Sequence, residues 1–330
     1  MTRRLLLGVD GGGTKTGFVL LDADGFIVAD HRESGAYHLQ IGLDGLRAML
    51  ERGLASLWAQ AGIGAGAIEH AFFGLPAHGE DSERQPQLDA LPESLLGHRR
   101  YRCGNDMVCT WAGALAGQDG IGLVAGTGAI GYGERRGASA RASGWGELFG
   151  DEGSAYWVAI QGFNAFSRMC DGRLPRGPLY GMVMERFGLR SALDLCGRLM
   201  GPPPLERDQI AACSSLVSQA AAAGDTVALA ILAAAADELS HVADALRVQL
   251  SFPPGETVPV SYSGGLFNTG ELLLAPLRAR LAARCPDFDL RPPLLSPGIG
   301  AALYAGRDCG IPLTAQAIDR LGAAQAALVT

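Results

Sequence analysis

Short apolar runs alternate along the chain with longer segments of amphipathic character. Apolar runs bounded by Gly, Asp or Asn predict strands, and apolar residues repeated at helical spacing predict helices. Strands are expected at 5–9, 18–21, 26–30, 68–75, 99–103, 121–125, 130–133 and 258–262. Helices are expected at 43–61, 85–96 (with a break at Pro92), 107–115, 155–169, 179–187, 191–199, 207–223, 226–249, 272–285, 301–305 and 315–328. This mixture of strands and helices indicates an α/β chain.

The first predicted hairpin carries a candidate phosphate site. Its sequence, LLLGVDGGGTKTGFVLLD at Leu5–Asp22, is an apolar strand ending at Asp10, then Gly11–Gly13, then a second strand. A turn without side chains lets an anion approach backbone N–H groups, and a carboxylate beside it suits Mg²⁺. Thr14 precedes Lys15, and a strand follows, so the segment is neither a Walker A loop nor a dinucleotide fingerprint. An ordinary hairpin with a Gly-rich bend is the alternative.

A second predicted hairpin of the same design follows, about one domain's length further along the chain. The predicted strand 121–125 ends in Gly126-Thr127-Gly128, and a strand resumes at Ile130. A matched pair of Gly/Thr turns suggests an internal duplication in which two phosphate-binding hairpins face one cleft. Such a pair is stronger evidence for nucleotide binding than either turn alone.

Asp106 lies where the predicted strand 99–103 passes through Gly104-Asn105 into a helix. It could be the N-cap of that helix, a common position for Asp. It could also present a carboxylate at the carboxyl end of a strand, where α/β folds place their chemistry. The two roles are compatible.

Two further loops have unusual compositions. Residues 144–154 read GWGELFGDEGS, which places one Trp and several carboxylates among glycines. An aromatic face and carboxylates suit the apolar side and the hydroxyls of a sugar ring; helix capping by Asp151 or Glu152 is the alternative. Gly264-Gly265 after the strand 258–262 would let a flat purine lie against bare backbone, or would be a plain turn.

Composition narrows the class of protein. The 330 residues are enough for two domains or one large one, and the net charge of −7 argues against a nucleic-acid partner. The seven cysteines are an odd number without a CxxC pair, so neither a disulfide framework nor a zinc site is expected. The six histidines show no metal-ligand spacing. No signal peptide is visible, and the longest apolar stretch, 227–236, is too short to span a bilayer and reads as a buried helix. A cytoplasmic enzyme is therefore expected.

Together these motifs resemble those of a known family. The segments are Asp10–Thr14, Asn105-Asp106, Gly126–Gly128, Gly144–Trp157 with its core GDEGSAYW, and Gly264-Gly265. In this order they are similar to the N-acetylglucosamine kinases of the BadF/BadG/BcrA/BcrD ATPase group, within the actin–hexokinase–chaperone superfamily. The resemblance covers nearly the whole chain, and GDEGSAYW points to the sugar-kinase branch.

The resemblance implies two ribonuclease H-like (actin-like ATPase) domains with an interdomain cleft. We expect them at 1–117 and 118–330, the second with a helical insertion and with the last helix packing back on the first. It implies a homodimer, ATP and Mg²⁺, and transfer of phosphate to the 6-hydroxyl of an amino sugar. The implied roles are Asp106 as catalytic base, Asp10 for the metal, and for ATP Gly11, Gly12, Gly13, Thr14, Lys15, Gly126, Thr127, Gly128, Gly264, Gly265 and Thr269.

The implied sugar contacts are Asp106, Gly144, Trp145 and Asp151. The family's sugar kinases usually present an Asn from the loop after the third strand, whereas this chain has Ser34-Gly35-Ala36-Tyr37-His38. Tyr37 and His38 are the candidates to replace it. N-acetylglucosamine is the leading acceptor and glucosamine its closest competitor. The rivals from other classes are an ATPase activator of a 2-hydroxyacyl-CoA dehydratase and a non-catalytic sugar or nucleotide sensor.

Overall fold

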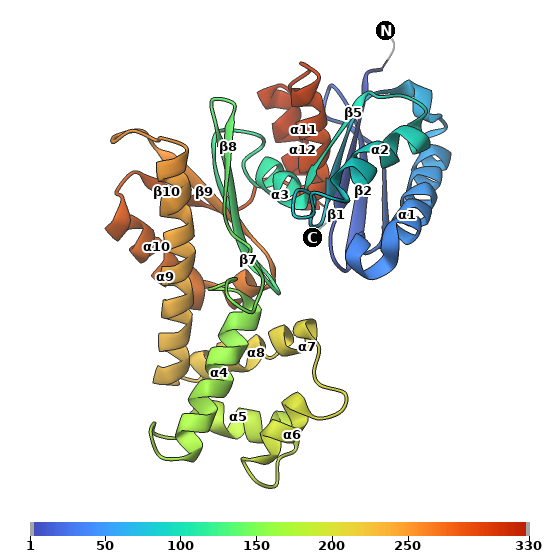
Figure 1. The fold of residues 1–330 in the computed structure, drawn as a ribbon. Coiled ribbons are helices and arrows are strands. Elements are labelled where there is room, and N and C mark those ends of the chain that lie inside the picture. The colour runs from blue at the N-terminus through green and yellow to red at the C-terminus, as the bar shows by residue number, and fades with distance from the viewer. Residues whose placement is uncertain (1–2, 328–330) are drawn as a thin grey trace. The chain divides into compact units, whose positions relative to one another are not determined.

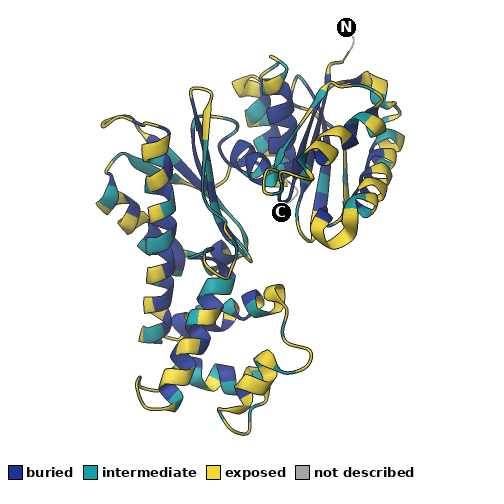
Figure 2. Cartoon of the chain, viewed as in Figure 1, coloured by how far each residue is buried: buried dark blue, intermediate teal, exposed yellow. Residues whose placement is uncertain are grey.

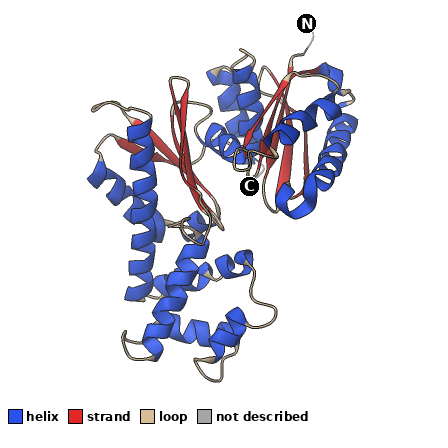
Figure 3. Cartoon of the chain, in the orientation of Figure 1, coloured by secondary structure: helices blue, strands red, loops and turns tan. Residues whose placement is uncertain are grey.

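The computed structural model describes residues 3–327 and divides into two compact units. Unit 1 contains the described residues up to Gly122 and from Pro292 onward, and unit 2 is Leu123–Arg291. Each unit is built on one five-stranded sheet with helices (Figures 1 and 3). The predicted α/β class is therefore confirmed.

The sheet of unit 1 has the strand order β3-β2-β1-β4-β5. Its strands are β1 Leu5–Gly11, β2 Lys15–Asp22, β3 Ile27–Ser34, β4 Ile68–Leu75 and β5 Tyr101–Asn105. Strands β1, β2 and β3 pair antiparallel, whereas β1 with β4 and β4 with β5 pair parallel. Its helices are α1 His38–Ala61, α2 Gln85–Leu96, α3 Asp106–Ala114, α11 Pro297–Asp308 and α12 Ala315–Ala327, with the short η1 Ala65–Ala67.

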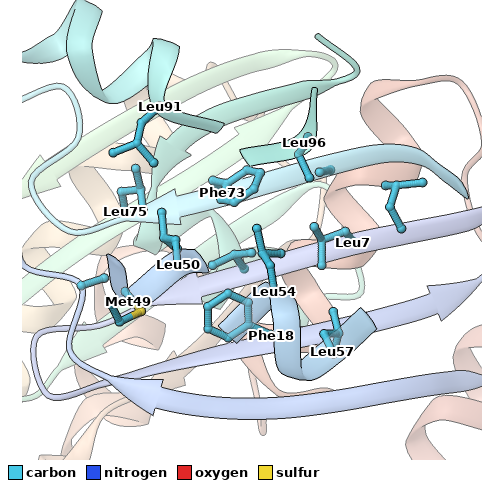
Figure 4. Close-up of a cluster of buried hydrophobic side chains, with 14 of the residues drawn as sticks. Leu7, Phe18, Met49, Leu50, Leu54, Leu57, Phe73, Leu75, Leu91 and Leu96 are labelled. Atoms are coloured by element: carbon cyan, nitrogen blue, oxygen red, sulfur yellow. The ribbon is translucent and has the colours of Figure 1, made fainter. Parts of the chain in front are cut away.

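Both faces of this sheet are covered, because successive residues of a strand point to opposite faces. On one face Leu7 and Phe18 pack with Leu50 and Leu54 of α1 in a buried apolar cluster (Figure 4). On the other face α11 lies directly on β1. The buried strands are nearly continuous apolar runs, as expected for a sheet covered on both sides.

Unit 2 repeats the strand order, since its sheet runs β10-β9-β6-β7-β8. The strands are β6 Gly120–Ala125, β7 Ala129–Arg135, β8 Ala138–Ser143, β9 Val258–Ser263 and β10 Phe288–Arg291. In both sheets the first strand is central, with the second and third strands on one side of it and the fourth and fifth on the other. This shared topology is what the expected duplication requires.

The helices of unit 2 lie mostly between β8 and β9 in the chain. They are α4 Ala155–Cys170, α5 Pro178–Phe187, α6 Asp194–Met200, α7 Arg207–Ala212, α8 Ser214–Ala222 and α9 Thr226–Gln249, followed by η2 Gly265–Thr269 and α10 Glu271–Arg284. Within the described residues α9 alone has the length and apolarity of a membrane span, but half of its most apolar window is buried inside the protein. Leu232, Leu239 and Leu246 of this helix are buried. Buried residues recur along the whole helix (Figure 2), as in a core helix.

Several element boundaries differ from those expected from the pattern. Strands β8 and β10 were not expected, because ASARAS has no apolar run and β10 has only four residues. The expected helix 207–223 is two helices, and α2 continues through Pro92. Helix α1 begins at His38, five residues early, with a non-helical Gly42 at φ 72°. The expected terminal helix reached Leu328, which lies outside the described residues.

The two units also divide the chain differently from the expected 1–117 and 118–330. That division returned only the last helix to the first domain, whereas the structure places everything described from Pro292 onward in unit 1. The reason is the close packing of α11 on β1. A Cβ placed on Gly8 would lie 2.3 Å from the backbone N of Ala302 and 2.7 Å from the carbonyl O of Gly298.

This contact yields a stability prediction. We expect Gly8→Ala to destabilise the protein by ~1–3 kcal/mol, because the added methyl group meets backbone that cannot move aside. The measurement is the urea midpoint of the purified variant. Gly17→Ala on the neighbouring strand β2 is the matched control, since a Cβ there meets nothing within 4 Å. Equal midpoints for the two variants would contradict this account of the packing.

Candidate active site

Three neighbouring strands of unit 1 end at the same edge of the sheet. Asp10 of β1 pairs in register with Gly74 of β4, and Leu75 pairs with Asn105 of β5. Because these strands are parallel, their carboxyl ends bring Asp10 close to Asp106, the first residue of α3. Gly74 makes room for this approach, since a Cβ there would lie 2.2 Å from Sγ of Cys109 and 3.2 Å from Cα of Asp106.

The capping role considered for Asp106 belongs to its neighbour. Asn105 is the N-cap of α3, and its side chain accepts a hydrogen bond from the Met107 N–H (3.1 Å) and donates one to the carbonyl O of His78 (3.2 Å). Asp106 therefore enters the first turn of the helix without serving as its N-cap. A carboxylate is favoured there by the partial positive charge of the helix N-terminus.

The pKa of Asp10 is raised from the ordinary 3.8 to about 7. The largest cause is burial, which disfavours the charged form, and the second is the negative charge of Asp106. The charge of Lys15 and a hydrogen bond from Cys109 act in the opposite direction. A carboxyl group whose ionisation is disfavoured by burial and by a neighbouring carboxylate is a frequent feature of catalytic and metal sites.

These oxygen donors fit Mg²⁺. A hard divalent cation prefers carboxylate oxygens and offsets the repulsion between two of them. Asp10 is the residue that could hold it.

The Gly-rich turn of unit 1 is closed on itself and covered by the next loop. Gly12 N–H donates to the Lys15 carbonyl (2.9 Å), and Ala36 N–H donates to the Gly12 carbonyl (2.9 Å). Gly35 lies so close that a Cβ on it would be 2.1 Å from the Gly13 carbonyl O. The structure thus brings the 34–38 loop against the turn and leaves Gly13, Thr14 and Lys15 exposed.

The two candidates to replace the missing Asn have different environments. Tyr37 is the N-cap of α1 and is partly exposed. His38 is buried, with neither ring nitrogen in a hydrogen bond of normal geometry, although the Pro76 carbonyl is near enough to affect its titration. Burial lowers the pKa of His38, so the ring is neutral at pH 7. Tyr37 is the more accessible of the two.

The second Gly/Thr turn lies at the end of β6 in unit 2. Gly126 N–H donates to the Gly128 carbonyl (2.9 Å), and the Gly126 carbonyl accepts from Ala155 N–H at the start of α4 (2.8 Å). Thr127 is exposed at its tip. Gly264, at φ 105°, packs on its base, since a Cβ there would lie 2.4 Å from the Ala125 carbonyl O.

The remaining candidates for the adenosine lie beside this turn. Gly265 begins η2, is exposed, and has open space where a side chain would project. Thr269 ends η2, and its hydroxyl is 2.9 Å from that of Ser218 on α8. Unit 2 thus groups Gly264 and Gly265 at the end of β9 with Gly126–Gly128 at the end of β6.

Asp151 is the buried centre of the Trp145 loop. It is 3% exposed and has φ 57°, and it accepts a hydrogen bond from the Gly146 N–H (3.2 Å). Its Oδ2 is 2.5 Å from Nη2 of Arg207, whose Nε is 2.8 Å from Glu147. Burial raises the pKa of Asp151, while the Arg207 charge opposes that shift. The helix cap considered for Asp151 or Glu152 is instead Ser154, which accepts from Trp157 N–H (3.1 Å).

This ion pair lies against the Gly126–Gly128 turn of the same unit. A Cβ on Gly128 would be 2.6 Å from Oδ2 of Asp151 and 2.9 Å from Nη2 of Arg207. Gly128 therefore lets a carboxylate and a guanidinium reach the turn together. Arg207 could not be singled out from the sequence, because it lies 56 residues from Asp151. A pairing at such a distance leaves no mark on local spacing.

Gly144 and Trp145 occupy the outer part of the loop. Gly144 has φ 75°, and its carbonyl accepts a hydrogen bond from Arg141 (2.6 Å). Trp145 is 72% exposed, and Leu148 and Phe149 beside it are also exposed. The loop thus presents its aromatic ring to solvent while Asp151 is held inside.

The model of the BadF/BadG/BcrA/BcrD ATPase family matches residues 7–305. The chain belongs to this family. The N-acetyl-D-glucosamine kinase of Dictyostelium discoideum is 27% identical over 319 residues, which are 92% of this chain and 98% of that protein. The N-acetylmuramic acid/N-acetylglucosamine kinase of Clostridium acetobutylicum is 25% identical over 307 residues, 93% of this chain and 99% of that one.

A solved structure of a provisionally named N-acetylglucosamine kinase from Chromobacterium violaceum is also similar to the chain. It has 28% sequence identity and a TM-score of 0.70, and the match covers 92% of this chain and all of that one. The family match confirms the ATPase resemblance inferred from the motifs.

The raised pKa of Asp10 predicts a dependence of stability on pH in this ATPase. The folded protein holds a proton on Asp10 up to pH about 7, whereas the unfolded chain loses it near 3.8. The contribution of Asp10 to the free energy of unfolding is therefore fully present below pH 3.8, and it is lost as the pH rises from 3.8 to about 7. We expect Asp10→Asn, which cannot ionise, to unfold at a temperature at least about 2 °C higher than wild type at pH 8.

The comparison is made by thermal unfolding in EDTA, and the difference should disappear near pH 4. Asp44→Asn, an exposed substitution on α1, should show no such difference. If Asp10→Asn and the wild type had the same unfolding temperature at every pH, the raised pKa of Asp10 would be contradicted.

Proposed function

We propose that this ATPase-family protein transfers the γ-phosphoryl group of ATP to the 6-hydroxyl of an amino sugar, with N-acetylglucosamine as the leading acceptor. The observation that carries the proposal is the position of Asp106. It lies beside Asp10, and Asn105 is the N-cap of α3 in its place. The names of the similar proteins from Dictyostelium, Clostridium and Chromobacterium support the acceptor.

Asp106 would act as the catalytic base. An ionised carboxylate within reach of the sugar 6-hydroxyl orients it and accepts its proton as the new P–O bond forms. Phosphoryl transfer otherwise needs mainly positioning and charge neutralisation. Asp10 would hold Mg²⁺, which would supply part of that neutralisation.

The two Gly/Thr turns would bind the ATP phosphates. Gly11–Gly13 and Gly126–Gly128 would line the phosphates, with donors from the exposed tips of the turns at Gly13, Thr14 and Thr127. The N–H groups of Gly12 and Gly126 already donate within their own turns and close them. Lys15 adds a positive charge. Gly264, Gly265 and Thr269 would border the adenosine.

The Trp145 loop and the 34–38 loop would bind the sugar. Asp151 would accept hydrogen bonds from sugar hydroxyls, with Gly144 and Trp145 at the rim, and Tyr37 or His38 would replace the usual Asn. Arg207 would be a positioning residue, because it holds the buried Asp151 beside Gly128. We also propose a cytoplasmic homodimer that requires Mg²⁺, as expected from composition and from the resemblance.

The acceptor is tested by an ATP-coupled assay against N-acetylglucosamine, glucosamine, N-acetylmannosamine, N-acetylmuramic acid and glucose. We expect the highest kcat/KM for N-acetylglucosamine. Preferential use of glucosamine would overturn the acceptor assignment. No transfer to any sugar would overturn the kinase proposal and favour a sensor or an activator ATPase, which hydrolysis of ATP without sugar would then distinguish.

Asp106→Asn tests the catalytic base. The amide cannot accept the proton, so we expect kcat to fall by about 10²–10⁴. Sugar binding, measured by calorimetry, should largely survive, because the amide still forms hydrogen bonds. Asp44→Asn serves as control. Turnover like that of wild type in Asp106→Asn would remove this residue from the role.

Arg207→Ala tests the support of Asp151. Loss of a charged hydrogen bond to a buried carboxylate is worth ~1.5–3 kcal/mol, so we expect KM for the sugar to rise about tenfold or more. The KM for ATP should change less, and Arg207→Lys, which keeps the charge, should recover part of the loss. Arg198→Ala, an exposed substitution on α6, is the control. If Arg207→Ala and Arg207→Lys changed kcat, the KM for the sugar and the KM for ATP to the same extent, Arg207 would have a general structural role. That result would contradict its proposed role in positioning Asp151.

A further inference from the structure

His78, Asp89 and Cys103 form a cluster in unit 1 that the proposed reaction does not use. They come from the loop after β4, from α2 and from β5, respectively. Their ligand atoms all lie within 4.8 Å of one another, and Nε2 of His78 is 2.8 Å from Oδ1 of Asp89. Three successive segments of the chain thus bring one nitrogen, one oxygen and one sulfur atom close together.

We propose that this cluster binds one zinc ion. Imidazole nitrogen, carboxylate oxygen and thiolate sulfur are the three ligand types that zinc takes in proteins, and a tetrahedral site needs only one more ligand. A thiolate in the set disfavours Mg²⁺ and Ca²⁺, which prefer oxygen. The site is therefore chemically different from the magnesium site proposed at Asp10.

The hydrogen bonds around His78 supply a second, independent observation. Nε2 of His78 faces Asp89 Oδ1 at 2.8 Å and the side-chain nitrogen of Gln85 at 2.6 Å. The same Gln85 nitrogen also contacts both oxygens of Asp89 at 3.2 and 3.1 Å, and the Gln85 oxygen accepts from the Gly79 N–H at 2.8 Å. The contact to Gly79 fixes which end of the amide is nitrogen.

One proton cannot satisfy this arrangement. A protonated Nε2 of His78 could donate to Asp89, but the N–H group of Gln85 would then point at another donor. An unprotonated Nε2 could accept from Gln85, but it would then face a carboxylate oxygen of Asp89 with no proton between them. A cation in place of the proton would accept lone pairs from both His78 and Asp89. Cys103, whose hydrogen bond to the Leu88 carbonyl is long at 3.7 Å, is the third donor.

The site connects to the start of α3 through the backbone. The carbonyl of His78 accepts the hydrogen bond from the Asn105 side chain, and Asn105 caps the helix that begins with Asp106. Cys103 precedes Asn105 by two residues on β5. A zinc ion bound to His78 and Cys103 would therefore fix the loop after β4 and the end of β5, which both contact or carry the cap residue Asn105. This is a structural role, and it does not depend on the proposed kinase activity.

The test uses the full-length protein, stripped with EDTA and then dialysed. Zinc content after re-addition should be one ion per chain by elemental analysis, and Co²⁺ should give the near-ultraviolet absorption of a thiolate ligand. Zn²⁺ should also raise the unfolding temperature of the wild type. His78→Ala and Cys103→Ser should each weaken binding by at least about tenfold.

Two further variants keep the result interpretable. Asp89→Asn changes a half-exposed side chain, so it should fold and yet lose the stabilisation by zinc, even if the other variants fold poorly. Cys196→Ser, at an exposed cysteine of unit 2, should bind like wild type. Failure of the wild type to retain zinc would overturn the proposal, as would full binding by Asp89→Asn or loss of binding in Cys196→Ser.

Discussion

The candidate active site of unit 1 depends on an unfavourable interaction, the close approach of two carboxylates. Asp10 and Asp106 are near enough that the charge of Asp106 raises the pKa of Asp10, which burial has already raised. The repulsion between the two charges disfavours such a pair, so the surrounding packing must hold the two residues together. A cation and a phosphate-bearing substrate would turn this arrangement into a favourable one.

The packing that imposes it consists of close contacts at glycines. A Cβ on Gly74 would collide with Sγ of Cys109, and one on Gly300 would lie 2.2 Å from both the Cys109 carbonyl O and the Gly113 N. Helix α3 thus packs backbone to backbone on α11, and the Cys109 side chain fills the space that Gly74 leaves on β4. Because backbone contacts leave little freedom, the first turn of α3 and its Asp106 have a fixed position relative to β1. Stability is given up for this geometry, as is common at functional sites.

Much of the fold and of the candidate site could be predicted from the sequence, because the motifs that indicate them are contiguous in the chain. A Gly-rich turn next to a strand-end Asp, and its counterpart at Gly126–Gly128, are contiguous in the chain, and the two matching sheets follow from them. The capping of α3 could not be assigned, since Asn105 and Asp106 are both good caps and only the structure shows that Asn105 accepts from Met107. Arg207 and the His78–Asp89–Cys103 cluster arise from tertiary contacts between distant segments, which leave no periodic trace. Strand β8 was missed for a different reason: ASARAS is a small, polar strand that its partner β7 holds in place.

We propose that the loop that holds Asp151, with the residues around it, adapts this ATPase-family chain to a sugar. The most direct measurement is the position of the new phosphate, determined by ³¹P and ¹H NMR on the product of an incubation with ATP and N-acetylglucosamine. The account predicts a phosphomonoester coupled to the C6 protons of the sugar. A phosphate on the anomeric carbon, or release of inorganic phosphate alone, would contradict it.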